Sequence, residues 1–276
     1  MSETRPEQGE ASIASHPQAD VPFFIEVGVP SRRIAVRRRF GAGAGALEPG
    51  ILWLGGFKSD MQSTKAARLD AWAAETGRAF LRFDYSGHGE SGGDFTAGTI
   101  GLWLEESLAA LHIAPPGPLI LVGSSMGGWI ALLVARALAQ AGRASRLAGM
   151  VLIAPATDFT EALLLPRLPP SALEALRTYG VWLRPSPYSS EPYPITQTLI
   201  EEGRRHLLLG GTIRSHCPVH VIQGMRDEDV PWHHAVTLVE HLAGDAATLT
   251  LVKDGDHRLS RDEDILRLIA AVAAIA

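Results

Sequence analysis

The sequence predicts an α/β protein with a mostly parallel sheet of eight strands and helices on both faces. Two observations indicate this fold. Short apolar runs alternate along the chain with segments of helical periodicity, and one of these runs, residues 51–54, is apolar at every position. The length of 276 residues allows one large α/β domain or two small ones. Because strands and helices alternate, most neighbouring strands are expected to run parallel.

Eight runs fit strands and six segments fit helices. The expected strands are residues 23–27, 34–40, 51–54, 79–83, 119–122, 149–153, 219–223 and 248–252. The expected helices are residues 64–76, 100–112, 128–140, 196–209, 231–242 and 261–274. Gly77 is placed to end the first helix. The glycine-rich residues 41–45 predict a hairpin turn.

Two segments depart from this alternation. Residues 1–21 hold four acidic residues against Arg5 and few apolar ones, so we expect a disordered acidic tail before one domain over residues 22–276. Residues 158–216 are too long for a single crossover and are rich in proline, leucine and aromatic residues. We therefore expect a helical cap insertion there. The alternative for its apolar side chains is that they only pack the cap onto the core.

The composition excludes several classes of function. Lys and Arg total 25 against 30 for Asp and Glu, a net charge of −5, so the basic footprint of a nucleic-acid-binding protein is absent. No apolar run approaches the roughly 18–20 residues that a membrane span requires. The single cysteine, Cys217, excludes an intrachain disulfide framework and a multi-cysteine metal site. One cysteine also favours a reducing compartment, so we expect a cytoplasmic protein.

The strongest functional signal is the pentapeptide Gly-Ser-Ser-Met-Gly at residues 123–127, between an expected strand and an expected helix. This context is the one that a G-x-S-x-G nucleophile elbow requires. In so sharp a turn a Cβ at Gly123 or Gly127 would clash, and Ser125 would be exposed at the helix N-terminus. A chance Gly/Ser turn is the alternative. A dinucleotide-binding motif is disfavoured, because it would need glycine where Ser125 stands.

A serine hydroxyl is a weak nucleophile unless a base takes its proton. In folds with this elbow the acid and then the histidine follow the serine in the chain. The chain has ten histidines, and we expect His257 to be the base because it lies on the loop after the last expected strand. We expect Asp227 to be the acid because it follows the strand before that one. Asp158, which follows residues 149–153, is the rival acid. Asp229 is expected to cap the helix that follows.

Backbone N–H groups are needed to bind the oxyanion that forms during acyl transfer. We expect one from Met126, directly after the nucleophile, and one from Phe57, after the glycine pair at residues 55–56. A plain glycine turn is the alternative at that pair. Residues 84–91 are interpreted as a structural loop beside the site, with His88 as a hydrogen-bonding scaffold residue.

Together these residues resemble the α/β-hydrolase superfamily over about residues 23–276. Within it, three motifs are similar to the mitochondrial palmitoyl-protein thioesterase/acyl-glucuronide esterase group and its bacterial relatives: Gly-Phe-Lys-Ser-Asp-Met at 56–61, Arg-Phe-Asp-Tyr-Ser-Gly-His-Gly-Glu-Ser at 82–91 and Gly-Ser-Ser-Met-Gly-Gly-Trp at 123–129. Many superfamily members carry histidine where Gly55 and Gln223 stand in this chain. The resemblance implies ester or thioester hydrolysis with no metal or organic cofactor.

We therefore expect a serine hydrolase that cleaves carboxylic esters or thioesters with an apolar acyl group through an acyl-enzyme. Its partner would be a small-molecule or acylated-protein substrate. A C–C bond hydrolase and a cofactor-free haloperoxidase use the same triad and stay open as alternatives. A non-catalytic binding module would usually have lost a triad member, and a carboxylate-nucleophile enzyme is disfavoured by Ser125. The sequence leaves the acyl-chain length and the oligomeric state open.

Overall fold

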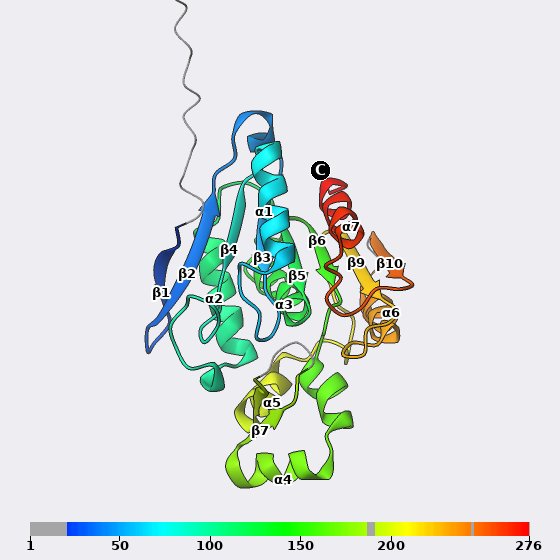
Figure 1. Cartoon of the computed structure of the whole chain (residues 1–276). Helices are drawn as coiled ribbons and strands as arrows, with labels where there is room; N and C mark the ends of the chain where they lie inside the picture. The colour runs from blue at the N-terminus through cyan, green and yellow to red at the C-terminus, as the bar shows by residue number, and fades with distance from the viewer. Residues whose placement is uncertain (1–20, 187–190, 244–245, 276) are drawn as a thin grey trace, which may run out of the picture.

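The computed structural model describes residues 21–186, 191–243 and 246–275 (Figure 1). The acidic tail expected over residues 1–21 lies, apart from Val21, outside the described residues. Within the described ranges, no helix has both the length and the apolar character needed to cross a membrane.

Eight strands form one sheet in the order β1-β2-β4-β3-β5-β6-β9-β10. The pairs β1–β2 and β2–β4 are antiparallel and all other neighbours are parallel, which confirms the mostly parallel sheet. The strands are β1 (Phe23–Val27), β2 (Arg32–Arg39), β3 (Gly50–Leu54), β4 (Phe80–Phe83), β5 (Leu119–Ser124), β6 (Leu147–Ile153), β9 (Val219–Gly224) and β10 (Ala247–Val252).

Helices cover both faces of this sheet (Figure 1). One hydrophobic cluster joins one face of the sheet to α2 (Ile100–His112), α3 (Met126–Gln140) and α6 (Trp232–His241). A second cluster joins the other face to α1 (Thr64–Thr76) and α7 (Asp262–Ala273). The largest side chains of both clusters, Trp103 and Trp129 in the first and Trp53 in the second, are at most 1% exposed. Burial of apolar area on both faces is the main force that holds the layers together.

The expected hairpin turn at residues 41–45 is wrong. The hairpin joins β1 to β2, and residues 43–47 form a short 3₁₀-helix instead, because the neighbour of β2 is β4 rather than β3. Gly45 packs there against the end of α1, where a Cβ would come within 2.1 Å of the Thr76 carbonyl oxygen. Gly77 ends α1 in the left-handed conformation, as expected.

Residues 158–216, which we call the cap segment, lie between β6 and β9. They form α4 (Pro170–Tyr179), the antiparallel pair β7 (Val181–Arg184) and β8 (Tyr193–Thr196), and α5 (Gln197–Gly203). In Figure 1 α4, α5 and β7 lie beyond one end of the sheet. Four buried side chains make a small core of their own within the segment, Leu164, Leu176, Ile195 and Ile200.

Two expectations for the cap segment are corrected. It is not purely helical, because β7 and β8 pair. The helix expected at residues 196–209 ends at Gly203 and continues only as a 3₁₀ turn to His206. Glycine is a poor helix former, and a Cβ at Gly203 would come within 2.8 Å of Thr160 Oγ1. The helix thus ends at Gly203, where the backbone packs closely against Thr160.

Candidate active site

The turn between β5 and α3 holds Ser125 in a strained backbone conformation. Its φ of 55° and ψ of −118° lie outside the regions that a non-glycine residue prefers. A Cβ at Gly123 would come within 2.3 Å of the Gly127 carbonyl oxygen, and one at Gly127 within 2.1 Å of the Leu54 carbonyl oxygen. Both glycines are therefore required for the sharp turn that presents the Ser125 hydroxyl.

The structure brings the side chains of Ser125, His257 and Asp227 together. The Ser125 hydroxyl lies 3.1 Å from His257 Nε2, and His257 Nδ1 donates to Asp227 Oδ2 at 2.8 Å. Ser125 follows β5, Asp227 follows β9 and His257 follows β10, so the three meet beyond the carboxyl ends of parallel strands. The Asp227 carboxylate is fully buried, whereas the imidazole is 17% exposed.

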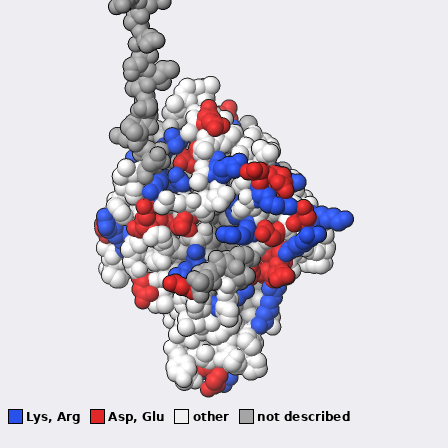
Figure 2. All heavy atoms as spheres, in the orientation of Figure 1, with Lys and Arg blue, Asp and Glu red and all other residues white. Residues whose placement is uncertain are grey.

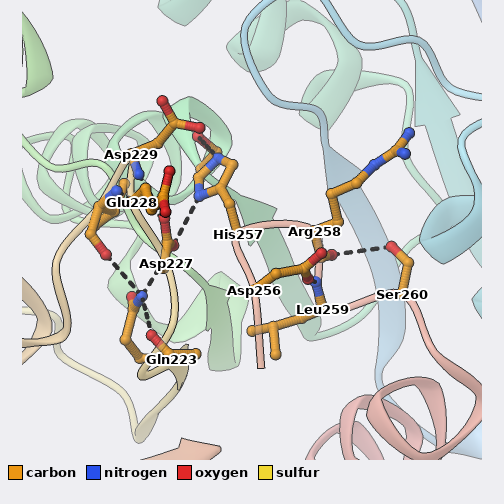
Figure 3. Close-up of polar contacts among 12 residues, drawn as sticks. Gln223, Asp227, Glu228, Asp229, Asp256, His257, Arg258, Leu259 and Ser260 are labelled. Carbon is orange, nitrogen blue, oxygen red and sulfur yellow. Dashed lines mark hydrogen bonds and ion pairs between the residues drawn. The ribbon is translucent and has the colours of Figure 1, made fainter. Parts of the chain in front are cut away.

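Four donors hold the Asp227 carboxylate, and Figure 3 shows two of them, His257 and Gln223. Besides His257, the Gln223 side-chain amide donates to Oδ2 at 3.0 Å. The backbone amides of Asp229 and Val230 donate to Oδ1 at 3.0 and 2.8 Å. Gln223 is completely buried. These bonds fix the orientation of the carboxylate toward the imidazole.

The two other acids considered from the sequence lie elsewhere. The Asp158 carboxylate accepts hydrogen bonds from the backbone amides of Leu208 and Leu209, and burial raises the pKa of this acid. It thereby joins the beginning of the cap segment to a later part of it. The expected capping role of Asp229 is wrong, because α6 begins after Pro231 and Asp229 pairs with Arg184.

Phe57 and Met126, the expected oxyanion-binding residues, line the same cavity as Ser125 and His257. Met126 is the first residue of α3, so its backbone N–H belongs to the turn whose amides have no acceptor within the helix. The backbone beside Phe57 is anchored at two points. The Lys58 amide donates to His88 Nε2 at 3.2 Å, and the Met61 amide donates to Asp84 Oδ1 at 2.6 Å.

His88 is a scaffold residue, as its place in the 84–91 loop suggested. Its Nδ1 donates to the Ser86 carbonyl oxygen at 3.1 Å, which leaves Nε2 to accept from Lys58. Burial lowers the pKa of His88 to about 4, so the ring is neutral and the acceptor is available at neutral pH. Of the glycine pair in front of Phe57, Gly56 is the crowded one, because a Cβ there would lie 3.2 Å from the Ser124 carbonyl oxygen; at Gly55 the nearest atoms are 4.0 Å away.

A cavity of about 230 Å³ lies between Ser125 and the cap segment. Apolar side chains of the cap segment form much of its wall, namely Leu163, Leu164, Leu168, Trp182, Tyr193 and Ile195. Other apolar residues behave differently: Leu176 and Ile200 pack inside the cap segment, and Tyr179 is 77% exposed. Leu164 and Ile195 do both, because they belong to the core of the cap segment and also line the cavity. On the face shown in Figure 2, the cap end carries few charged side chains, whereas charges of both signs are mixed over the body.

A second, more polar hollow also borders Ser125 and His257. Its wall includes Lys58, Lys65 and Arg258. The ammonium group of Lys65 donates to the carbonyl oxygen of Arg258, the residue after His257 in the chain, and burial lowers the pKa of Lys65 to about 8. Ser125 therefore borders both an apolar cavity and a polar one.

One cluster among the described residues has the spacing of metal ligands, and it falls on this site. It consists of Asp227, Asp229 and His257, whose side-chain ligand atoms lie within 4.8 Å of one another. All three make the hydrogen bonds or ion pairs described above, so their arrangement is accounted for by the contacts within the protein.

Comparison with known proteins defines the family. A sequence model described as the alpha/beta hydrolase family matches residues 26–271, so the chain belongs to the α/β hydrolase family. It is 35% identical over 230 residues to the mitochondrial palmitoyl-protein thioesterase ABHD10 of Bos taurus. The aligned region covers 81% of this chain and 72% of that protein. It is 34% identical over 225 residues to the human protein of that name, with 81% and 72% covered.

Solved structures agree with this assignment. A hydrolase structure from Agrobacterium vitis S4 superposes with a TM-score of 0.87 at 48% identity, covering 92% of this chain and 98% of that one. The mouse alpha/beta hydrolase domain-containing protein 10 superposes with a TM-score of 0.80 at 32% identity, covering 92% and 97%. Est1E from Butyrivibrio proteoclasticus, at 17% identity and a TM-score of 0.72, shares the fold; 91% of this chain and 96% of that one are covered.

Proposed function

We propose that this protein is a serine hydrolase that cleaves carboxylic esters or thioesters with an apolar acyl group. The observation that carries the proposal is the hydrogen-bonded series Ser125–His257–Asp227 opening directly on an apolar cavity. Family membership supports hydrolysis, and the relatives named as palmitoyl-protein thioesterases support an acyl thioester or ester as the substrate.

In the proposed mechanism His257 takes the proton of the Ser125 hydroxyl as the oxygen attacks the acyl carbonyl carbon. Asp227 keeps the proton on Nδ1, so that Nε2 is the basic nitrogen, and stabilises the imidazolium that forms. His257 then gives the proton to the leaving alcohol or thiol, and the acyl group remains on Ser125. Water, activated by the same imidazole, hydrolyses this acyl-enzyme and restores the serine.

The tetrahedral intermediate carries a negative oxygen that needs donors. We assign these to the backbone amides of Phe57 and Met126, each next to Ser125 along the cavity wall. The acyl chain would lie against the leucine and tryptophan side chains of the cap segment. The leaving group would face the polar hollow that Lys58 and Lys65 line. From there the alcohol or thiol product could pass into solvent.

The proposal is tested by labelling the purified protein with a fluorophosphonate and locating the adduct by mass spectrometry. We expect one adduct, on Ser125. Ser125→Ala should abolish labelling and lower kcat for a p-nitrophenyl ester by up to about 10⁶-fold if the three residues act as a unit. Ser260→Ala is the matched control, since this serine also lines the polar hollow but lies away from His257 Nε2. A label elsewhere, or full activity without the Ser125 hydroxyl, would refute the proposal.

A further inference from the structure

A second carboxylate, that of Asp229, lies beside the imidazole. One of its oxygens is within 4.8 Å of a ring nitrogen of His257 and of an Asp227 oxygen. Figure 3 shows it pointing toward the ring from the same loop that carries Asp227. The mechanism proposed above gives this acid no role. A carboxylate this close to a base favours the protonated, inactive imidazolium unless its charge is balanced.

The charge is balanced from the cap segment. Arg184, at the end of β7, places Nη2 2.7 Å from Asp229 Oδ1. A second arginine of the segment, Arg167, donates from Nη1 to the carbonyl oxygens of Glu228 and Asp229 at 3.2 and 2.9 Å. Both arginines line the apolar cavity. The loop after β9 therefore contacts His257 through Asp227 and contacts the cap segment through Glu228 and Asp229.

We propose that Asp229 is a positioning residue that tunes the basicity of His257, and that its ion pair with Arg184 links this tuning to the seating of the cap segment. With Arg184 in place, the negative charge of Asp229 is shared with a guanidinium, so less of it acts on the imidazole. Without the guanidinium of Arg184, the charge of Asp229 would act on His257 unshared. The inference rests on the proposed function, since it requires His257 to act as the base.

Other charged groups surround the imidazole, and they stay unchanged in the experiment below. Besides Asp229 and Arg184, the described charged residues on the loop of His257 are Lys253, Asp254, Asp256, Arg258 and Arg261, and those on the loop after β9 are Arg226, Asp227 and Glu228. The walls of the two hollows add Lys58, Asp60, Lys65, Arg167 and Glu191. Arg184 and Asp229 have side-chain exposures of 40% and 21%, so solvent screens part of their effect. We therefore expect a shift of about 0.5–1 pH unit, at the low end of what a close charge produces.

The test is the pH dependence of kcat/KM for p-nitrophenyl butyrate, whose acid limb reports the base of the free enzyme. Arg184→Gln leaves Asp229 unbalanced, so the acid limb should move to higher pH. Asp229→Asn leaves Arg184 unbalanced, so the limb should move to lower pH. The double variant should return close to the wild-type limb. Arg177→Gln is the matched control, because this cap arginine is 74% exposed and does not line the cavity.

A purely structural role would give a different result. Loosening of the cap segment alone would raise KM equally at every pH and leave the limb in place, and this outcome in both single variants would overturn the inference. Salt at 1 M should reduce the shifts, since the pair is partly exposed. Ser125→Ala, assayed in parallel, separates the two hypotheses. If this variant kept wild-type activity, the proposed function itself would be wrong. If it lost activity but the acid limbs of the Arg184 and Asp229 variants did not move, only the role of Asp229 would be wrong.

Discussion

Asp227 accepts a hydrogen bond from Nδ1 of His257 at 2.8 Å across 30 residues of sequence. The carboxylate is fully buried and bound by three further donors, so it has one orientation. That geometry selects one imidazole tautomer, with Nε2 free of its proton and directed at the Ser125 hydroxyl.

The contrast between Asp227 and Asp158 gives the first prediction. Asp227→Asn should lower kcat by about 10⁴-fold with little change in fold, because an amide favours the wrong tautomer of the base. Asp158→Asn should keep kcat within tenfold and lower the free energy of unfolding by about 1–3 kcal/mol, because a buried acceptor of backbone amides is weakened. Steady-state kinetics and urea denaturation measure both. Equal losses of kcat in the two variants would contradict this assignment.

The elbow glycines give the second prediction. Gly127→Ala should lower the free energy of unfolding by about 3 kcal/mol or more, since its Cβ would meet the Leu54 carbonyl oxygen at 2.1 Å and backbone there has little room to move. Gly55→Ala is the matched control, with its nearest atoms 4.0 Å away, and should cost less than about 1 kcal/mol. Thermal and urea denaturation compare the two variants. Equal stability would mean that the elbow relaxes around the added methyl group.

The third prediction concerns the apolar cavity. For p-nitrophenyl esters, kcat/KM should rise at least about tenfold from acetyl to octanoyl, because burying each methylene contributes up to about 0.8 kcal/mol. Trp182→Ala should reduce the octanoyl-to-acetyl ratio, because this side chain lines the cavity. Tyr179→Ala, on the exposed end of α4, should leave the ratio unchanged. A profile that is flat or falls with chain length would show that the acyl group binds elsewhere.

The fourth prediction concerns acid stability. The pKa of His88 is depressed to about 4, below the usual value near 6.5, so the neutral ring favours the folded state. Its contribution to the free energy of unfolding is fully present above about pH 6.5 and is lost as the pH falls toward 4. By pH 4.5 the loss amounts to about 2–3 kcal/mol. His88→Gln, whose side-chain oxygen can still accept from the Lys58 amide, should therefore lose less stability between pH 7 and pH 4.5 than the wild type. Urea denaturation at both pH values tests this, and identical losses would exclude the role of His88.

Much of the fold could be predicted because its signals are local. The period of apolar residues sets each strand and helix of the main sheet, and α1 and α2 have the expected bounds. The elbow was also predictable, since Gly123, Ser125 and Gly127 are adjacent in the chain and the turn demands small residues. The compartment, inferred from a single cysteine, stays a prediction.

Local sequence patterns thus predicted the α/β class, the strands and helices around the sheet, and Ser125, Asp227 and His257 as candidate site residues. The order of β2, β4 and β3, the β7–β8 pairing and the ion pair between Arg184 and Asp229 became known only from the folded structure. The reason is that each of these depends on contacts between segments distant in the chain. A helix period or a turn is visible in neighbouring residues, whereas the partner of a strand edge or of a surface arginine is selected only when the whole chain has packed.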